Sequence, residues 1–201
     1  MNPSGCADFY PDLLRRILDL SSNVAYKTFV VAITGPDCAG KSTATRWLLD
    51  NLSEQNIKCS ALAADSYIRP REQRTGLPNE AEDYYRNGFN FDHLLRDLNT
   101  LKRQIDADLP DQNHIIIVEG VFLLKSDISQ YWDAAFWLDI SDDQILERGT
   151  RRDADFFGSR EKAAEIYESQ IIPAQHLHRT LDNPESKADR VYIGRRARLN
   201  D

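Results

Sequence analysis

Residues 28–42 read Thr-Phe-Val-Val-Ala-Ile-Thr-Gly-Pro-Asp-Cys-Ala-Gly-Lys-Ser. The apolar run has the character of a buried strand, and it leads directly into a complete G-x-x-x-x-G-K-[ST] phosphate-binding loop with a helical pattern behind it. Gly35 and Gly40 permit the tight turn that presents successive backbone N–H groups to phosphate oxygens. The stretch therefore predicts a strand–loop–helix unit that binds a nucleoside triphosphate.

The chemistry of this loop assigns a role to its polar residues. Lys41 supplies a positive charge for the β- and γ-phosphates, and Ser42 offers a hydroxyl to Mg²⁺. The other loop residues that we expect to contact the nucleotide are Asp37, Ala39 and Thr43. ATP and Mg²⁺ are the expected cofactors. The alternative is an ordinary glycine turn between a strand and a helix, with an incidental lysine.

The composition limits the setting in which this loop works. The chain has 201 residues and a net charge of −7, and we expect one domain with a helical extension over residues 1–27. The acidic balance argues against nucleic acid as the main partner, because binding the phosphate backbone needs a basic surface. The start of the sequence lacks the features of a signal peptide, and no apolar stretch is long enough to span a bilayer. The three cysteines, at positions 6, 38 and 59, show no metal-site spacing, so we expect reduced thiols in a cytoplasmic protein that does not engage a membrane.

Apolar strand-like runs alternate with helical patterns along the chain. The expected strands are 28–34, 58–64, 114–118, 135–140 and 190–193, and the expected helices are 10–20, 42–53, 91–107, 142–151 and 160–181, the last bent at Pro173. Alternation of this kind predicts an α/β fold with a parallel sheet and helices on both faces. In such sheets ligands bind at the carboxyl ends of the strands, so the residues just after each strand are the first candidates for a site.

Two of these strands deliver a carboxylate at that edge. Asp65 follows the second strand, where it would orient an acceptor hydroxyl and take its proton; the alternative is an aspartate that caps the next turn. Glu119 follows the third strand, where an acid commonly completes the Mg²⁺ site of phosphate-loop enzymes; the alternative is an exposed acid at a strand end. Both positions fit a phosphoryl-transfer site.

Three arginines, Arg148, Arg151 and Arg152, lie close together at the end of the helical pattern after the fourth strand. A guanidinium remains charged and meets phosphate oxygens with two hydrogen bonds, so the cluster predicts a phosphate clamp. We expect residues 148–160 to form a mobile lid. The alternative is a solvated surface.

Taken together, five segments resemble the uridine kinase and phosphoribulokinase group. They are the loop 35–42, Asp-Ser-Tyr at 65–67, Phe-Asn-Phe-Asp-His at 89–93, Val-Glu-Gly at 118–120 and the arginine-rich stretch 148–153. Lys-Ala-Asp-Arg-Val-Tyr-Ile at 187–193 is similar to the last strand of that family. The resemblance spans about residues 28–194 and implies the fold of a nucleoside-kinase-like P-loop NTPase.

The resemblance also implies roles for individual residues. Asp65 would be the base toward a sugar hydroxyl, Glu119 would lie near Mg²⁺, and the three arginines would belong to the lid, with Arg148 and Arg152 acting in catalysis beside Lys41 and with Arg151 on the nucleotide. The residues expected against the acceptor are Tyr67, Phe91, Asp92 and Arg71. For Phe91 an ordinary core aromatic is the alternative. His93 is expected to cap or pack, and His114, His176 and His178 are expected on the surface or on helices, without a role.

One segment departs from the uridine kinase pattern. In that family the stretch before the Glu-Gly strand includes a hairpin that brings aromatic, histidine and arginine groups onto the pyrimidine. Here no Tyr, Trp or Arg follows Arg103 before that strand. Replacement contacts would come from Arg69, Arg71, Arg74 and Tyr84-Tyr85, which otherwise are solvated surface.

The sequence thus predicts an ATP-dependent kinase that phosphorylates a hydroxyl of a small, nucleoside-like acceptor. Two alternatives remain: a related kinase of a sugar, vitamin precursor or sugar phosphate, and a nucleotide-binding regulatory protein without turnover. The absence of an Asn-Lys-x-Asp motif counts against a GTPase.

Overall fold

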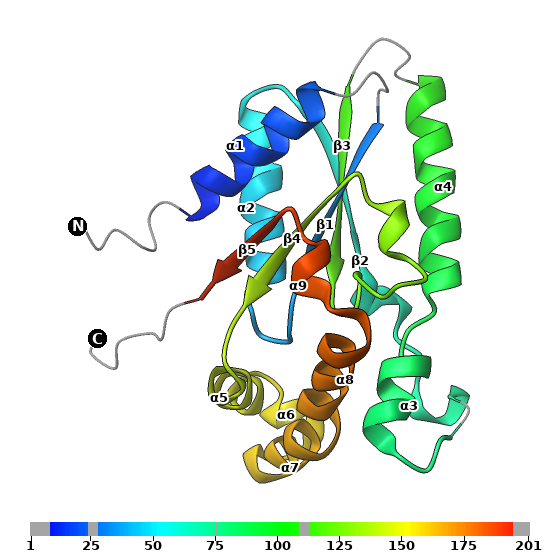
Figure 1. Ribbon diagram of the computed structural model, residues 1–201, viewed down its shortest axis with the longest axis vertical. Coiled ribbons are helices and arrows are strands. Elements are labelled where there is room, and N and C mark those ends of the chain that lie inside the picture. The colour runs from blue at the N-terminus through cyan, green and yellow to red at the C-terminus, as the bar shows by residue number, and fades with distance from the viewer. Residues whose placement is uncertain (1–8, 24–27, 75, 109–112, 195–201) are drawn as a thin grey trace, which may run out of the picture.

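The structure, a computed structural model, describes residues 9–23, 28–74, 76–108 and 113–194. In this part of the chain five parallel strands form one sheet with the order β2-β3-β1-β4-β5 (Figure 1). The strands are β1 (Thr28–Thr34), β2 (Lys58–Ala63), β3 (His114–Gly120), β4 (Ala134–Asp139) and β5 (Arg190–Ile193). The predicted α/β fold is confirmed, and each expected strand is present with its ends shifted by at most two residues.

The central strands explain why the sheet forms around the phosphate-binding loop. β1 and β3 are buried along their full lengths, as expected for apolar strands covered on both faces. Their register aligns Ile33 with Glu119, and the β2–β3 register aligns Ala63 with the same Glu119. The three strands therefore end nearly level with one another, and the loop and Asp65 follow at the same edge as Glu119, the second-to-last residue of β3.

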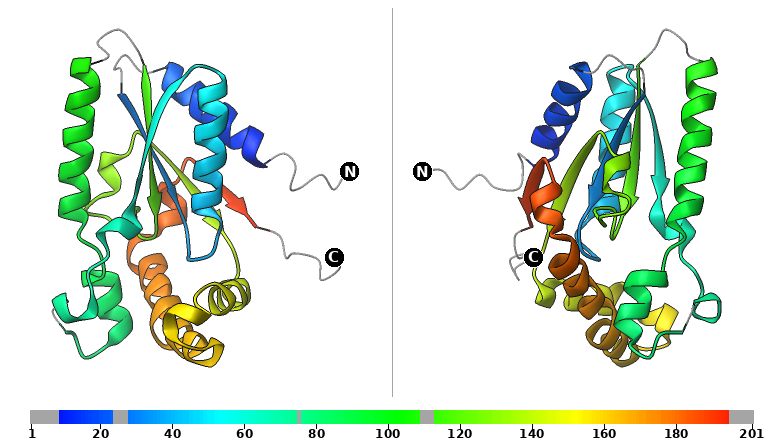
Figure 2. Two further views of the ribbon diagram at one scale, coloured as in Figure 1. Left: turned by 180° about the vertical axis from the view of Figure 1, so that it is seen from behind. Right: turned by 45° about the vertical axis from the view of Figure 1, so that its right-hand side comes forward.

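Helices cover both faces of the sheet (Figure 2). On one face α1 (Phe9–Ser22) and α2 (Lys41–Glu54) bury Ile17 and Leu48 against the odd-numbered residues of β1. On the other face α4 (Phe91–Asp108) buries Leu94 and Leu98 against the even-numbered ones. Because both faces are buried, the open ends of the strands are the part of the sheet left for ligands.

A group of shorter helices lies beyond the carboxyl ends of the strands, at the bottom of Figure 1. These are α3 (Glu80–Asn87), α5 (Asp142–Arg152), α6 (Ala154–Phe157), α7 (Arg160–Ile166) and α8 (Ile172–Asp182). A final short helix, α9 (Pro184–Lys187), leads into β5. The predicted lid, residues 148–160, comprises the end of α5, all of α6 and the beginning of α7.

The structure corrects the predicted helix over residues 160–181. It consists of α7, a π-helical turn, Tyr167–Ile171, and α8, so it is not one continuous α-helix. Pro173 lies in the first turn of α8, where its missing N–H is tolerated. The irregularity thus precedes the proline, and π-helical turns occur frequently at functional sites.

Two further local findings complete the fold. His114 is a buried residue of β3, 6% exposed, whose ring bonds to Ser60 at 2.8 Å, so the expectation of a surface or helical histidine was wrong. None of the helices within the described ranges has the length and apolar character needed to cross a membrane.

Candidate active site

The phosphate-binding loop is fixed from behind by the sheet. A Cβ atom on Gly35 would lie 2.0 Å from the carbonyl oxygen of Leu138 in β4, so only glycine permits this close approach. Gly40 has φ of 91°, and no atom lies within 4 Å of the place where its Cβ would be. The loop is therefore packed on its inner side and open on its outer side, where phosphate groups would bind.

Lys41 is the first residue of α2 and is only 8% exposed. Its ammonium group donates to the carbonyl oxygen of Pro36 at 2.8 Å, within its own loop. This contact holds the charged end of the side chain at the mouth of the loop. The position at the N-terminus of a helix adds to the positive potential there.

Ser42 and Glu119 form the expected pair beside the loop. The Ser42 hydroxyl donates to Oε1 of Glu119 at 3.1 Å, although the two residues are 77 positions apart. Glu119 is 8% exposed, and burial raises the pKa of its carboxyl group, while the nearby Lys41 charge and the Ser42 hydrogen bond oppose the shift. A hydroxyl and a carboxylate, both oxygen ligands, are thus placed next to the phosphate site.

A cavity of about 380 Å³ brings the predicted donor residues together. Its lining includes both strand-end acids, the outer part of the phosphate-binding loop and the arginine cluster. The lining residues are Asp37, Cys38, Gly40, Lys41, Ser42, Thr43, Asp65, Glu119, Arg148, Arg151 and Arg152. Gly35 and Ala39 belong to the same loop but do not line this cavity. Asp65 lies in a 3₁₀ turn, Ala64–Tyr67, and its side chain is exposed.

Two arginines of α5 are held by hydrogen bonds, Arg148 to the phosphate-binding loop and Arg152 to residues that follow α5. Arg148 donates to the carbonyl oxygen of Cys38 at 3.1 Å. Arg152 forms two hydrogen bonds to Asp153, at 2.7 and 2.9 Å, and a third to the Tyr167 hydroxyl at 3.0 Å. The hydrogen bonds to Asp153 raise the pKa of Arg152 further above its usual value. The cluster therefore stays cationic at the edge of the cavity.

Three of the residues expected against the acceptor, Tyr67, Phe91 and Asp92, do not line this cavity. Tyr67 donates to Asp97 at 2.8 Å and packs edge-on against His93. Phe91 is half-buried and stacks on Phe89 with ring centroids 5.5 Å apart. Asp92 is exposed at the start of α4.

The segment after Asp65 is joined to the Phe-Asn-Phe-Asp segment through the backbone. The N–H of Asn90 donates to the carbonyl oxygen of Tyr67 at 2.8 Å, and that of Arg69 donates to Gly88 at 2.8 Å. Two motifs that the sequence placed in separate regions thus form one wall next to Asp65.

The arginines expected as replacement contacts are engaged elsewhere. Arg71 forms an ion pair with Glu80. Arg74 donates to the carbonyl oxygen of Arg69 at 3.0 Å, and its guanidinium lies 5.2 Å from the ring centroid of Tyr84. Both arginines line a separate cavity of about 270 Å³ that also contains Glu80 and Asp83. Carboxylates therefore accompany these cations.

Two contributors to the site had no sequence signal. Gln175 in α8 donates to Oδ2 of Asp37 at 2.8 Å, across 138 positions. Tyr167, fully buried, donates to Asp153 at 2.6 Å and lies 3.8 Å from the Cys38 sulfur. Both lie in the segment predicted as one helix over residues 160–181, and neither local spacing nor composition distinguishes them from core residues.

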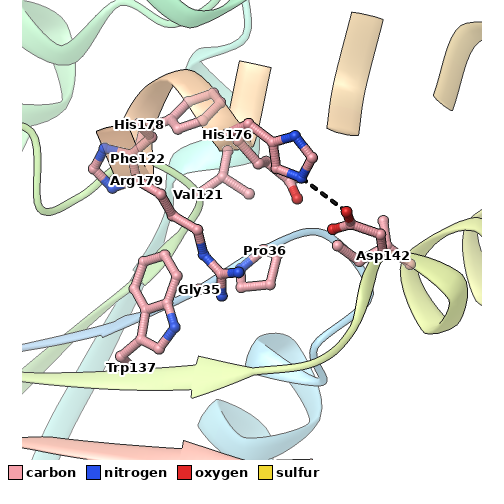
Figure 3. Close-up of a pocket in the computed structure, with 11 residues that line it drawn as sticks. Gly35, Pro36, Val121, Phe122, Trp137, Asp142, His176, His178 and Arg179 are labelled. Carbon is pink, nitrogen blue, oxygen red and sulfur yellow. Dashed lines mark hydrogen bonds and ion pairs between the residues drawn. The ribbon is translucent and has the colours of Figure 1, made fainter. Parts of the chain in front are cut away.

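A small cavity of about 10 Å³ lies behind the loop, between β4 and α8 (Figure 3). At its edge His176 bonds to Asp142 at 2.8 Å, which connects α8 to α5. The guanidinium of Arg179 lies 5.6 Å from the ring centroid of Trp137 and pairs with Asp139. These contacts hold α8 against the loop and so fix the position of Gln175.

Comparisons with known proteins find similarity to uridine kinases. No protein-family profile matches the chain. Curated relatives include the uridine kinase of Staphylococcus epidermidis, 25% identical over 194 residues that cover 83% of this chain and 92% of that protein. The uridine kinase of Staphylococcus aureus strain JH9 is 26% identical over 186 residues, covering 83% and 87%. The predicted resemblance to uridine kinases is thus confirmed.

Solved structures with this fold include a possible uridine kinase from Bacillus stearothermophilus, with a TM-score of 0.66, 21% identity and coverage of 92% of this chain and 98% of that one. A candidate fructose transport system kinase from Silicibacter sp. TM1040 has a TM-score of 0.70, 20% identity and coverage of 91% and 98%. At these identities the structures establish the shared fold, which is that of P-loop kinase-like proteins.

Proposed function

We propose that this protein is an ATP-dependent kinase that transfers the γ-phosphoryl group to a hydroxyl of a small, nucleoside-like acceptor. The observation that carries the proposal is the single cavity lined by Lys41, the Ser42–Glu119 pair and Asp65. These groups come from the ends of two strands and from the phosphate-binding loop. Phosphoryl transfer requires that the phosphoryl donor and the acceptor bind in one space.

The donor half would bind the triphosphate. Backbone N–H groups of the open loop and the Lys41 ammonium would hold the phosphates, and Arg148, Arg151 and Arg152 would meet their oxygens from the lid side. The Ser42 hydroxyl and the Glu119 carboxylate fit a magnesium ion, which would neutralise phosphate charge when bound. No group of three or more metal-binding side chains occurs among the described residues, which fits an ion that phosphates also help to hold.

In the acceptor half of the site, the hydroxyl group of the bound acceptor would be the nucleophile. Asp65 would accept the proton of the acceptor hydroxyl while the hydroxyl oxygen forms a bond to the γ-phosphorus and the bond to the β-phosphate oxygen breaks. Because the arginines remain charged throughout, they would stabilise the negative charge on the transferring group. The products would be ADP and the phosphorylated acceptor.

A second candidate function is a related kinase with a non-nucleoside acceptor, such as a sugar. The observation that favours it is the link between α4 and β3, which spans only residues 109–113. The described elements on either side of this link contain no hairpin that would read a pyrimidine, and no Tyr, Trp or Arg lies between Arg103 and β3. The fructose-related name of one structural neighbour points in the same direction.

ATP consumption across a panel of nucleosides, sugars and vitamin precursors tests the proposal. Turnover should be lost in Lys41→Ala, whereas Asp65→Asn should lose phosphoryl transfer and retain nucleotide binding, measured by calorimetry. Arg46→Ala, on the exposed side of α2, is the matched control and should behave as wild type. Acceptor-independent hydrolysis that a protein partner stimulates would instead support a regulatory protein, and full turnover in Asp65→Asn would contradict the assigned base.

A further inference from the structure

We infer that Asp37, a residue of the phosphate-binding loop, binds hydroxyl groups of the acceptor together with Asp65, and that the acceptor is a polyhydroxylated compound without a negative charge. This inference rests on the proposed kinase function and narrows its substrate class. It also moves Asp37 from the nucleotide side, where the motif alone placed it, to the acceptor side.

The position of Asp37 is fixed by contacts from outside the loop. Oδ2 accepts a hydrogen bond from the Gln175 amide at 2.8 Å, and Oδ1 lies 3.8 Å from the Arg152 guanidinium. The side chain is 16% exposed, and it lines the same cavity as Asp65. A carboxylate is thus held from α8 at the place where the γ-phosphate and the acceptor would meet.

The surroundings of Asp37 include a third polar group. Burial is the main cause of a raised pKa at Asp37; the charges of Lys41 and Arg152 oppose the shift, and the charge of Asp65 adds to it. The phenol of Tyr84, in α3, has a pKa well above its usual value because it is buried and because it senses both Asp37 and Asp65. Asp37 and Asp65, from two separate segments, therefore line one space, and the Tyr84 phenol is near enough to sense the charge of both.

This arrangement suits hydroxyl groups and disfavours phosphate on the acceptor. Carboxylates accept hydrogen bonds from neutral hydroxyls, and two of them lining one cavity match neighbouring hydroxyls on a sugar or polyol. A phosphate or carboxylate on the acceptor would instead be repelled by both acids, more strongly by the largely buried Asp37 than by the exposed Asp65. The two acids thus select for hydroxyls by attraction and against anions by repulsion.

The cations of the cavity itself, Lys41 and the three arginines, are the groups proposed to hold the triphosphate, and the basic residues outside the cavity do not offset this repulsion. Arg71 is paired with Glu80, and Arg74 lies over Tyr84 in the cavity that contains Asp83. Asp83 has a lowered pKa, in part because of Arg74, so it remains ionised beside that arginine. Arg71 and Arg74, two of the cations that a second phosphate group would need, are therefore already accompanied by acids.

The test compares Asp37→Asn with the wild-type protein on the acceptors that support turnover. We expect the acceptor KM to rise about tenfold or more, since a charged hydrogen bond is lost, while the KM for ATP changes less than about twofold. Wild type should use neutral polyols or nucleosides at least about tenfold better than their monophosphates. Analogues that lack one hydroxyl beside the reacting one should lose affinity in wild type and lose little further in Asp37→Asn.

Asp153→Asn is the matched control because Asp153 is the other acid that contacts Arg152. It should lower kcat and leave the acceptor KM unchanged, which separates acceptor binding from positioning of the arginine. Asp37→Ser, a smaller polar substitution, repeats the test if the asparagine variant fails to fold, as judged by its thermal melting.

The outcomes distinguish the inference from the proposed function. If no compound in the panel is phosphorylated, the kinase proposal itself fails. If an acceptor is phosphorylated but Asp37→Asn and Asp37→Ser keep its KM, or if a phosphorylated acceptor is preferred, the role of Asp37 is overturned and the kinase remains. A fall in kcat like that of Asp153→Asn, without an acceptor KM effect, also overturns it.

Discussion

Two buried carboxylates in this protein show how different a buried acid becomes when its neighbours differ. Glu119, at the phosphate-binding loop, and Asp182, in α8, are 8% and 7% exposed. Asp182 accepts hydrogen bonds from the backbone N–H of Ser126 at 2.8 Å, from the Ser126 hydroxyl at 2.9 Å, from His178 at 2.8 Å and from Tyr85. Among the described residues, Glu119 meets a single hydrogen-bond donor, Ser42.

The pKa values of the two acids shift in opposite directions as a result. Burial pushes both upward, but the hydrogen bonds to Asp182 outweigh it and hold its pKa below the usual range. At Glu119 burial prevails and the pKa rises. The two carboxylates are equally buried, but their surroundings differ. Asp182 is surrounded by hydrogen-bond donors and has a structural role, whereas Glu119 has too few donors to satisfy its oxygens. The second has spare oxygen lone pairs facing the cavity, as a cation site requires.

Removing the charge of Glu119 should have the largest effect, and it should fall on activity. We expect Glu119→Gln to lower kcat/KM by about 10³-fold, or about 4 kcal/mol of transition-state stabilisation, because the amide binds a divalent cation poorly. Steady-state kinetics at several magnesium concentrations measures this. The control is Glu54→Gln at the end of α2. Unchanged kinetics in Glu119→Gln would place the cation elsewhere.

The same change at Asp182 should act on stability. Asp182→Asn removes the charge that His178, Tyr85 and Ser126 surround, and we expect the free energy of unfolding to fall by about 2–3 kcal/mol. The activity per folded molecule should remain near that of wild type. Urea unfolding and active-site titration measure the two quantities. A large loss of activity in a fully folded variant would contradict a purely structural role.

This contrast also marks what the sequence predicted and what it did not. The strands, the loop and the strand-end acids Asp65 and Glu119 follow from local patterns, because buried parallel strands are apolar throughout and end at one edge. Gln175 and Tyr167 reach the site from a helix more than 100 residues away, and only the packing of α8 shows it. Nothing in the sequence indicates that Asp182 accepts several hydrogen bonds whereas Glu119 accepts one.

The pH dependence of stability should separate the two acids with opposite signs. The folded pKa of Asp182 lies below its unfolded value near 3.8, so its contribution is present above that pH and is lost as the pH falls further. The folded pKa of Glu119 lies above 4.5, so its contribution is present below that pH and is lost as the pH rises through the folded pKa.

Glu119→Gln should therefore be more stable than wild type at pH 7 without magnesium or nucleotide, and the gain should shrink on acidification. Asp182→Asn should show a deficit at pH 7 that shrinks only at lower pH. Urea unfolding at pH 7 and about pH 4.5 measures both. A Glu119→Gln variant that is less stable than wild type at pH 7 would contradict this prediction. It would show that the buried charge of Glu119 stabilises the folded protein.

The smallest expected effect on activity and stability concerns Tyr167. This residue is buried like Asp182 and, like Glu119, it contacts the phosphate-binding site. Its ring packs against Gly149, where a Cβ atom would lie 2.2 Å from the ring, and its hydroxyl connects Asp153 to Arg152. Tyr167→Phe keeps the packing and removes the connection. We expect kcat to fall about three- to tenfold while the free energy of unfolding falls by about 1 kcal/mol, since one hydrogen-bonding group is lost.

Tyr85→Phe provides the matched comparison, because that hydroxyl bonds to Asp182 in the structural region. It should lower stability by a similar amount and leave kcat unchanged. Kinetics and urea unfolding of both variants, with ATP and acceptor saturating, decide between the two roles. If both phenylalanine variants change kcat equally, the hydroxyl of Tyr167 acts only through overall stability. If only Tyr167→Phe does, the hydrogen bond positions Arg152 for the transferring phosphate.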